Sequence, residues 1–446
     1  MKEIIYNSRY CTGCSACSQA CPSKAVTMEA DDEGFLFPLI DENLCNDCDL
    51  CKRICPVNKA FFSKHGIVTD EDGSSVFIAG KEGLLSASAD KDVSSIEGKG
   101  RLSSASAGND GTSSLSAGNG ENPHTFTGKR AFACYSTNDE TRGKSSSGGI
   151  FSELAVKTLE NGGVVFGAAF DSDFSVRHRF VDSIDSLDDL RRSKYVQSDI
   201  GDTFIKAKEF LDEGREVLFC GTPCQIAGLK SFLRKNYTNL CACDLACFGV
   251  PSPKVWEMYT DFLKDRHQSG IRSISFRDKS GGWKEYHMRI SFTNGDEYLV
   301  KAKDELYFIG FGKNIFNRRA CFDCRFRVQN SGADITLADF WGIDKMNIEV
   351  NDDNRGVSLA ITHSKTGEVA MARIGDFAAL SECDAGEAVK YNPRLVSSAA
   401  EPAGRAAFFA DMKNGFDFDR LRRKHMDNFS MKYKLKRMIK KVLGRG

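Results

Sequence analysis

Long hydrophobic runs are missing from this sequence of 446 residues. No stretch of about eighteen apolar residues occurs, and the N-terminus has no apolar segment of the kind found in signal peptides. We therefore expect neither a membrane-spanning helix nor secretion, and a cytoplasmic location. Net charge is missing as well: Lys and Arg total 61, and so do Asp and Glu, which gives no general attraction to nucleic acid.

Two nucleotide-binding fingerprints are also absent. The sequence contains no G-x-G-x-x-G, which excludes a dinucleotide site of the Rossmann type. Residues 138–145 (NDETRGKS) resemble a P-loop but lack its first glycine, and no predicted strand leads directly into them. We therefore do not expect an ATPase.

Cysteine, by contrast, is abundant, and eight of the 17 cysteines fall in two runs with the same spacing. Each run reads C-x2-C-x2-C-x3-C-P, the bacterial ferredoxin signature in which three thiolates hold one [4Fe–4S] cluster and the fourth reaches the other cluster. The ligands expected for the first cluster are Cys11, Cys14, Cys17 and Cys55. Those expected for the second cluster are Cys45, Cys48, Cys51 and Cys21.

A structural zinc site and a disulfide framework are the alternatives for these eight cysteines. Zinc sites usually combine two separated pairs of ligands, often with His, and disulfide frameworks are typical of secreted proteins. The doubled spacing favours paired iron–sulfur clusters, and therefore a protein that transfers electrons.

Changes in composition divide the chain into five segments. Residues 1–61 are expected to form the ferredoxin domain, and residues 62–128, rich in Ser, Gly, Ala and Asp, a low-complexity linker that is disordered over residues 82–122. Strands and helices then alternate through two expected lobes at residues 129–265 and 266–400, and a basic amphipathic tail follows at residues 401–446. The expected fold class is α+β and α/β, a ferredoxin-like domain followed by an α/β body.

The spacing of apolar residues predicts the main elements of the body. Helices are expected at residues 150–159, 200–211 and 225–233, and buried strands at residues 163–170, 216–220, 335–340 and 356–362. Alternation on both sides of Asn294-Gly295 predicts a hairpin over residues 285–300, since this dipeptide favours a two-residue turn.

Two segments of the body have the composition of binding sites. Residues 145–149 (SSSGG) precede a predicted helix, whose N-terminal amides favour a phosphate, although the same residues also occur as ordinary helix caps. Residues 219–225 (FCGTPCQ) run from the end of a strand into the N-terminus of a helix, where Cys224 is a candidate thiolate.

Nine cysteines lie outside the ferredoxin runs. Four of them are candidates for a third cluster: Cys224, Cys247, Cys321 and Cys324. A structural zinc site and buried free thiols are the alternatives, because ligation between distant segments is not encoded in spacing. The other five are expected to be small core residues: Cys134, Cys220, Cys241, Cys243 and Cys383.

Several short motifs occur in an order that resembles the beta subunit family of coenzyme F420-reducing hydrogenases and dehydrogenases. They are SSSGG, KYVQS (194–198), GTPCQ, CFGVPSP (247–253), the C-x2-C at Cys321 and ADITLADFWG (333–342). The resemblance covers about residues 130 to 400, and an N-terminal two-cluster ferredoxin is a familiar fusion in the family. It implies an oxidoreductase whose α/β body binds flavin and which passes electrons between iron–sulfur clusters and FAD.

The resemblance also implies site residues and partners. Its FAD contacts fall on Ser146, Ser147, Gly148, Gly149, Lys194, Tyr195, Gln197, Gly221, Thr222 and Gln225. The implied partners are a ferredoxin or similar protein and an organic substrate, F420 or a nicotinamide, with a surface-polysaccharide pathway as one setting. A non-catalytic electron-transfer subunit of a larger complex is the alternative. Phe248 after Cys247, and Ala338 where the family has Gly, depart from the pattern.

The sequence does not identify catalytic residues. Candidate proton donors near a flavin, each of which also has an ordinary structural explanation, are Lys194, Tyr195, Asp334, Asp339 and His287. In the basic tail, one predicted helical face carries Met431, Leu435, Met438, Ile439 and Val442. This helix is expected either to dock on the protein body or an acidic partner, or to touch an anionic membrane surface.

Overall fold

The computed structural model describes residues 4–5, 8–59, 67–69, 75–77, 129–327, 330–350 and 352–426. Two sequence-based expectations lie outside these described residues: the disordered segment 82–122, and the apolar helical face between residues 431 and 442. Within the described part of the chain, no helix combines the length and the apolar character needed to cross a membrane.

Residues 8–59 form a small unit, called here the cluster module. It contains α1 (Ala16–Gln19), α2 (Leu50–Arg53) and a hairpin of β1 (Val26–Ala30) and β2 (Leu36–Ile40). The Asp31 carboxylate fixes the hairpin turn, because it accepts hydrogen bonds from the backbone amides of Glu33 and Phe35 at 3.0 and 2.8 Å. β3 (Ile67–Thr69) and β4 (Ser75–Phe77) pair in a separate hairpin.

One eight-stranded sheet organises the body, in the order β15-β5-β14-β13-β9-β8-β6-β7. Its strands are β5 (Arg130–Ser136), β6 (Val164–Phe170), β7 (Val176–Val181), β8 (Val217–Gly221), β9 (Leu240–Leu245), β13 (Ile335–Asp339), β14 (Ser358–Thr362) and β15 (Ala378–Cys383). The central strands β6, β8, β9 and β13 are parallel, and the outer strands run antiparallel to their neighbours. The carboxyl ends of parallel strands meet at one edge, where ligands bind in α/β proteins.

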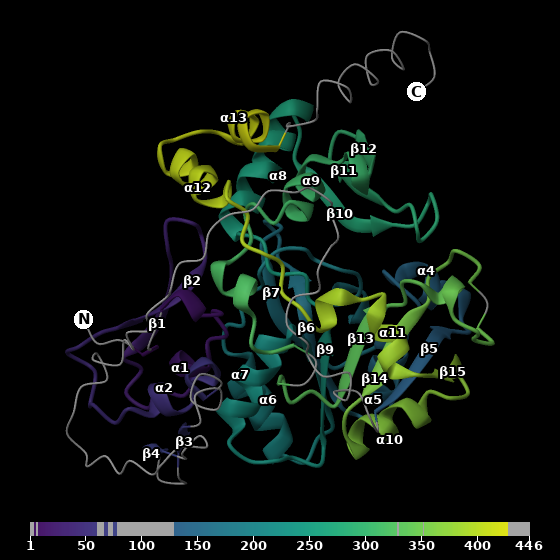
Figure 1. The fold of residues 1–446 in the computed structure, drawn as a ribbon, viewed down its shortest axis with the longest axis horizontal. Coiled ribbons are helices and arrows are strands. Elements are labelled where there is room, and N and C mark those ends of the chain that lie inside the picture. The colour runs from purple at the N-terminus through teal and green to yellow at the C-terminus, as the bar shows by residue number, and fades with distance from the viewer. Residues whose placement is uncertain are drawn as a thin grey trace, which may run out of the picture.

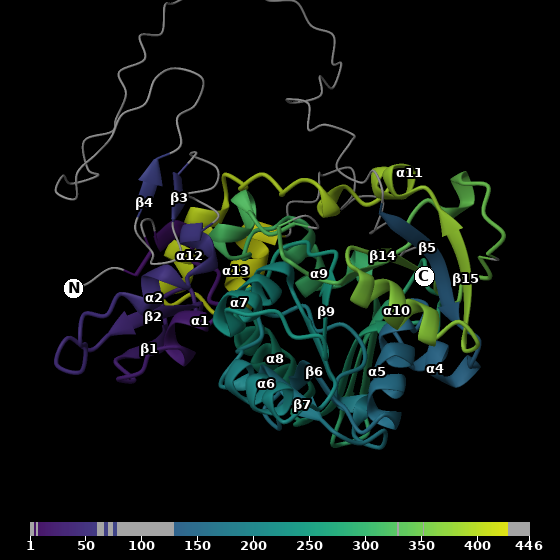
Figure 2. The ribbon, with the colours of Figure 1, turned by 90° about the horizontal axis from the view of Figure 1, so that it is seen from below.

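Helices cover both faces of the sheet, because its central strands are apolar on both sides. α5 (Ile150–Glu160) and α10 (Lys365–Arg373) pack on one face, and α6 (Thr203–Asp212), α7 (Pro223–Leu233) and α11 (Ala385–Lys390) pack on the other. α4 (Asp139–Lys144) follows β5. In the cluster module α1 contacts α6 and α7, so that α7 lies between the module and the sheet (Figure 2).

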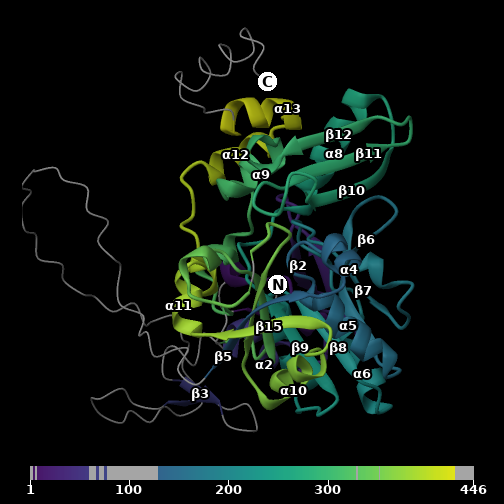
Figure 3. The ribbon, with the colours of Figure 1, turned by 90° about the vertical axis from the view of Figure 1, so that its right-hand side faces the viewer.

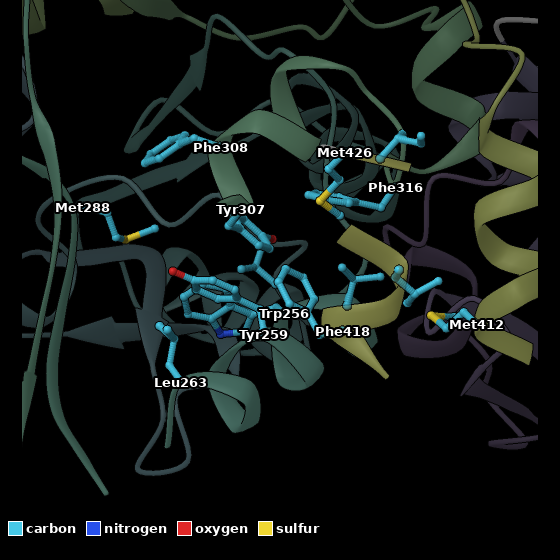
Figure 4. Close-up of a cluster of buried hydrophobic side chains, with 14 of the residues drawn as sticks. Trp256, Tyr259, Leu263, Met288, Tyr307, Phe308, Phe316, Met412, Phe418 and Met426 are labelled. Atoms are coloured by element: carbon cyan, nitrogen blue, oxygen red, sulfur yellow. The ribbon is translucent and has the colours of Figure 1, made fainter. Parts of the chain in front are cut away.

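A second, three-stranded antiparallel sheet is formed by β10 (Ile271–Asp278), β11 (His287–Phe292) and β12 (Glu297–Lys301). α8 (Pro253–His267), α9 (Leu306–Gly312), α12 (Arg405–Lys413) and α13 (Phe418–Leu421) pack with it at the top of Figures 1 and 3. Trp256, Tyr259, Tyr307 and Phe418 meet in their common core (Figure 4). The described start of the C-terminal segment, up to Met426, therefore docks on the body.

Short turns connect these elements. They are the 3-10 helices η1 (Ser8–Tyr10), η4 (Leu187–Asp189), η5 (Ala302–Asp304), η6 (Arg319–Asp323), η7 (Ile343–Lys345) and η8 (Pro393–Leu395), and the π-helical turn η9 (Arg422–Met426).

The mixed α/β fold agrees with the sequence-based expectation, and the predicted helices and strands are observed with shifts of a few residues. The hairpin around Asn294-Gly295 is present, with Gly295 at a φ of 95°, but it has a third strand, β10, that the sequence did not predict. The large sheet takes strands from both sides of residue 265, because β13, β14 and β15 return to it after the small sheet. The lobe boundary expected there does not separate two sheets.

The buried side chain of Arg318 joins the cluster module to the body. Its Nε donates to the carbonyl of Cys11 at 2.7 Å, Nη2 to that of Leu36 at 2.9 Å, and Nη1 to Gln197 Oε1 at 3.0 Å. Gln197 Nε2 in turn donates to the carbonyl of Thr12 at 3.0 Å. All three guanidinium nitrogens are thus hydrogen-bonded, which offsets the desolvation of the buried charge.

Helix α7 and the module make an equally close contact at Gly228. A Cβ atom on Gly228 would lie 3.0 Å from both Cβ and Sγ of Cys14. A side chain at this position would push Cys14 away from the helix backbone by a few tenths of an ångström.

We predict that Arg318→Met lowers the stability of the protein by about 3 kcal/mol, because it removes three hydrogen bonds of a buried charged group. Anaerobic thermal unfolding of the cluster-loaded protein would measure this as a lower Tm. Arg272→Met, at an exposed position on β10, is the control and is expected to stay within about 0.5 kcal/mol of the unsubstituted protein. Equal Tm values for the two variants would contradict the prediction.

Candidate functional site

The two cysteine runs of the cluster module fold in the same way. Gly13 and Asp47 occupy equivalent positions with φ of 67° and 56°, and Ser15 and Asp49 do so with φ of 60° and 52°. α1 begins directly after Ser15, and α2 begins directly after Asp49. Alternation of left-handed and right-handed residues turns successive N–H groups toward a common centre, the arrangement that many iron–sulfur sites use.

The thiols of the first predicted ligand set are gathered inside the module. Cys11, Cys14, Cys17 and Cys55 are each less than a tenth exposed. Burial and the nearby Cys11 thiolate raise the pKa of Cys55 to about 11. Burial, followed by the thiolates of Cys14, Cys11 and Cys55, raises the pKa of Cys17 well above its usual range. Cys55, from the second run, therefore lies with the first three cysteines, as the cross-over pattern predicts.

The thiols of the second predicted set lie nearer the surface. Cys48 is exposed, and Cys21, Cys45 and Cys51 are partly exposed. Burial raises the pKa of Cys51, and the thiolates of Cys21 and Cys48 raise it further. Cys21 thus lies beside the second run, although it belongs to the first.

Four cysteines of the body come together from three separate segments. Cys224 lies in the first turn of α7, Cys247 follows β9, and Cys321 and Cys324 lie in and directly after η6. Burial and the thiolates of Cys324 and Cys224 raise the pKa of Cys321 to about 12. Burial and the Cys224 thiolate raise the pKa of Cys324 to about 11. The four cysteines that the sequence suggested for a third cluster therefore form one group.

This group surrounds a space instead of converging on a point. All four thiols line a cavity of about 40 Å³. Across the described parts of the chain, no three His, Cys, Asp or Glu side chains are placed to share a single metal ion. A cubane carries one iron at each ligating thiolate, so its ligands stand apart around it, and the arrangement fits such a group.

A backbone hydrogen-bond donor reaches one sulfur atom of this group, and a hydroxyl oxygen lies beside another. The backbone N–H of Val250 donates to Cys321 Sγ at 3.4 Å, and Thr222 Oγ1 lies 3.3 Å from Cys224 Sγ. Donors of this kind, together with burial, are what tune the reduction potential of a cluster. Cys14 of the module is also close to Cys224. Burial raises the pKa of Cys14 most, and the thiolates of Cys55, Cys11 and Cys224 raise it further.

A larger cavity, of about 290 Å³, opens at the carboxyl edge of the parallel strands. The segments that follow β8, β9 and β13 line it, together with the N-terminus of α5. Residues 245–250 line both this cavity and the cysteine-lined one, and so form a wall between them. The structure therefore places the larger cavity beside the third cysteine group.

Most of the residues predicted to contact FAD line this larger cavity. They are Ser146, Ser147, Gly149, Lys194, Tyr195, Gly221, Thr222 and Gln225. Gly148 packs against the backbone of β5 and β14, where an added Cβ would lie 2.5 Å from the carbonyl oxygen of Cys134. Gln197 lies in the interface with the cluster module instead. Neither of these two is among the residues that line the cavity.

The start of α5 offers amides to the cavity. Its N-cap is Gly149, with a φ of 96° and no side-chain cap, and Ile150 and Phe151 line the cavity after it. The preceding loop is held in place, because Ser146 Oγ accepts from the backbone N–H of Ser193 at 2.8 Å and Ser147 Oγ donates to the carbonyl of Val357 at 3.0 Å. Such a helix end favours a bound phosphate.

A polar network that the sequence did not reveal forms one wall of the cavity. Gln225 Nε2 donates to Ser198 Oγ at 2.9 Å, and Ser198 Oγ lies 2.8 Å from His178 Nδ1. His178 Nε2 lies 3.1 Å from the carbonyl of Cys220, which can only accept, so Nε2 carries the proton and Nδ1 accepts from Ser198. Burial lowers the pKa of His178 to about 4, so the ring is neutral at pH 7.

Three of the five candidate proton donors line the cavity. Lys194 Nζ donates to the carbonyls of Asp189 and Arg191 at 2.9 and 2.6 Å, and burial lowers its pKa to about 7. Tyr195 packs among the rings of Phe276, Phe308 and Phe311. Asp339 forms an ion pair with Arg277.

The other two candidates, Asp334 and His287, are not among the residues that line the cavity. Asp334 stabilises the fold, because its carboxylate accepts from the backbone N–H of Ala242 at 2.8 Å and from Ser364 Oγ at 2.6 Å. His287 lies on β11.

We predict a pH-dependent contribution of His178 to stability. The unfolded chain protonates this residue near pH 6.5, whereas the folded state resists protonation down to about pH 4. Its contribution is therefore complete above about pH 6.5 and is lost as the pH falls toward 4, by about 2 kcal/mol between about pH 7.5 and 5. Urea unfolding across this range should give a shallower loss of stability for His178→Gln than for the unsubstituted protein. Equal slopes would refute this role of His178.

Two family models match the chain. Residues 214–385 match the model for the C terminus of the coenzyme F420 hydrogenase/dehydrogenase beta subunit, and residues 10–59 match the 4Fe-4S dicluster domain. The twelve cysteines of the three groups all fall inside these two matches.

Comparisons with individual proteins are less informative than the two family models. A search of curated proteins finds no match. Among solved structures, the chain is similar to one from "Xenon derivatization of the F420-reducing [NiFe] hydrogenase complex from Methanosarcina barkeri", with 16% identity and a TM-score of 0.39, over 60% of this chain and 91% of that one. From the two domain matches, the chain is an iron–sulfur redox protein: its residues 214–385 are similar to the C terminus of coenzyme F420 hydrogenase/dehydrogenase beta subunits, and its residues 10–59 match a 4Fe–4S dicluster domain.

Proposed function

We propose that the protein is an oxidoreductase that depends on FAD and on three [4Fe–4S] clusters, and that it exchanges electrons between a protein partner and a small organic molecule. One observation carries this proposal. The cysteine-lined cavity of the body shares the wall 245–250 with the 290 Å³ cavity and lies next to the buried cysteines of the cluster module. The three cysteine groups thereby connect the exposed Cys48 with the larger cavity.

Each cysteine group supplies four ligands. The outer group consists of Cys21, Cys45, Cys48 and Cys51, the inner group of Cys11, Cys14, Cys17 and Cys55, and the third group of Cys224, Cys247, Cys321 and Cys324. Iron–sulfur clusters carry single electrons at potentials that hydrogen bonds and burial adjust. Burial raises the pKa of the Cys224 and Cys321 thiols, and the buried Arg318 guanidinium, which acts in the opposite direction, supplies positive charge between the inner and third groups.

The larger cavity fits FAD in its shape and in its polar groups. Its volume is close to the lower end of the range for organic-ligand sites, about 300 Å³. The uncapped start of α5 and the side chains of Arg191 and Arg192 would receive the diphosphate, since all of them line the cavity. Exposed apolar side chains at Leu245 and Phe248, 40% and 43% exposed, would be covered by the rings.

When bound, FAD accepts two electrons together as a hydride and releases them one at a time. The residues around it have separate tasks. The neutral His178 holds Ser198 and Gln225 in position and does not exchange protons near pH 7, because its pKa is about 4. Lys194 Nζ, with a pKa of about 7, is the group that holds or moves a proton near neutral pH.

The partners follow from the two ends of this arrangement. A ferredoxin or similar protein would dock over the exposed Cys48, and the larger cavity would admit an organic substrate, F420 or a nicotinamide. We place this activity in the cytoplasm.

The iron content tests the number of clusters. Anaerobically purified protein is expected to hold about twelve irons per chain, at four per cubane. Cys321→Ser combined with Cys324→Ser should reduce this to about eight, because it removes two ligands of the third group only. Cys383→Ser, on β15 and outside all three groups, is the control and should keep about twelve. About eight irons in the unsubstituted protein would restrict metal to the cluster module.

The flavin content tests the larger cavity. We expect about one FAD per chain, and at least a tenfold weaker affinity for FAD in Ser146→Glu, because a carboxylate beside the start of α5 repels a diphosphate. Iron content should be unchanged. Ser183→Glu, in an exposed loop away from the cavity, is the matched control.

Oxidation of a reduced dye by an organic acceptor would then distinguish an enzyme from a subunit that only carries electrons. Iron–sulfur protein that contains no flavin and does not bind added FAD would overturn the proposal.

A further inference from the structure

Arg277 is a buried cation with an unused hydrogen-bonding edge. It lies on β10 of the small sheet, lines the 290 Å³ cavity and is 5% exposed. Its Nη1 donates to Asp339 Oδ2. Nε and Nη2 are both buried and have no hydrogen-bond partner among the described residues.

The other three arginines that are buried as completely among the described residues are Arg142, Arg318 and Arg405, and they are hydrogen-bonded at every guanidinium nitrogen. Arg142 donates to Asp353 and to the carbonyl of Gly356, and the guanidinium of Arg405 to Glu33 and the carbonyl of Asn317. Arg318 also uses Nε, Nη1 and Nη2. Desolvating the donors of a charged group without partners is costly, so the free edge of Arg277 indicates that something else supplies its acceptors.

The side chain of Arg277 is held rigidly in this position. Asp339 Oδ1 accepts from Trp283 Nε1 at 3.1 Å, so both oxygens of the carboxylate are in use. Trp283 stacks on Trp341 with ring centroids 4.8 Å apart and ring planes 4° from parallel. The guanidinium carbon lies 4.4 Å from the ring centroid of Tyr286. The group is therefore preorganised, which is typical of a binding residue.

The charge of the cavity favours an anion at this place. Of the described residues that line it, Arg191, Arg192, Lys194 and Arg277 are basic, and Asp339 is the acidic one. The first three come from the segment between η4 and α6, whereas Arg277 comes from β10 of the small sheet. The diphosphate of FAD would pair with that segment and leave Arg277 free.

We propose that Arg277 binds a carboxylate or phosphate group of the organic molecule that reacts in this cavity; this inference rests on the proposed function. Nε and Nη2 form one edge of the guanidinium, and this edge takes two oxygens of such a group at once. Trp341, which also lines the cavity, provides an aromatic surface beside it. The reacting molecule is thus an organic anion, and the small sheet supplies its specificity.

Benzoate, a planar carboxylate, is a suitable probe, and the Trp283–Trp341 pair next to Arg277 is a suitable reporter. Tryptophan fluorescence of the full-length, cluster-loaded protein would be titrated with benzoate, with and without added FAD. We expect the unsubstituted protein to bind benzoate saturably, and the affinity for benzoate to be at least tenfold weaker in Arg277→Gln. The loss of affinity should be smaller in Arg277→Lys, which keeps the charge but not the paired donors. Arg272→Gln, exposed on the same strand, should bind as the unsubstituted protein does.

FAD affinity, iron content and circular dichroism would be measured for the same variants. Unchanged values alongside weaker benzoate binding support the proposal. Equal benzoate affinity in Arg277→Gln and the unsubstituted protein would overturn it. Loss of FAD together with benzoate would also overturn it, because Arg277 would then bind a phosphate of the cofactor. If Arg277→Gln does not fold, Arg277→Lys decides by the same criteria.

Measurement without FAD keeps this test separate from that of the proposed function. Protein that binds benzoate through Arg277 but never binds FAD would refute the flavin proposal and leave the anion site standing. Protein that binds FAD and ignores benzoate in every variant would refute the anion site and leave the flavin proposal standing.

Discussion

The direct packing of Cys14 on Gly228 of α7 is the contact on which the rest of the arrangement depends. Cys224 lies four residues before Gly228, so both positions share one side of the helix, toward the cluster module. The capping box of Thr222 and Gln225 at the start of the same helix lines the larger cavity. A single helix thus brings the buried cysteines, the third cysteine group and the larger cavity within reach of one another.

Burial gives this arrangement an electrostatic cost that metal can relieve. The pKa values of Cys55 and Cys324 are each raised to about 11, chiefly because the thiolate form is desolvated. Cluster binding requires these thiols to lose their protons, so it is coupled to both pH and folding. The Arg318 guanidinium lies between the inner and third groups. Its positive charge offsets part of the cost of desolvating the Cys224 thiolate.

Local features of this protein could be predicted from its sequence, and long-range ones could not. The ferredoxin spacing identified the cluster module, because its ligands lie within short runs, and Asn294-Gly295 identified the hairpin. The partner of that hairpin, β10, joins it through the longer loop 279–286 and pairs with two register shifts, so it lacks the regular pattern that identified the hairpin. The same limit applies to side chains: neither His178 nor Arg277 belongs to a motif, and each acquires its environment from strands distant in sequence. Gln197 lies in a recognisable motif, yet its side chain contacts the module.

The outer and inner cysteine groups differ in exposure, and this difference determines how the protein would respond to air. Dioxygen and chelators reach Cys48 at the surface long before they reach Cys14 or Cys55 in the interior. Damage would therefore begin at the outer group and progress inward. A partly damaged molecule would lose the outer group first and keep the buried groups, so that inactivation by air would proceed in steps.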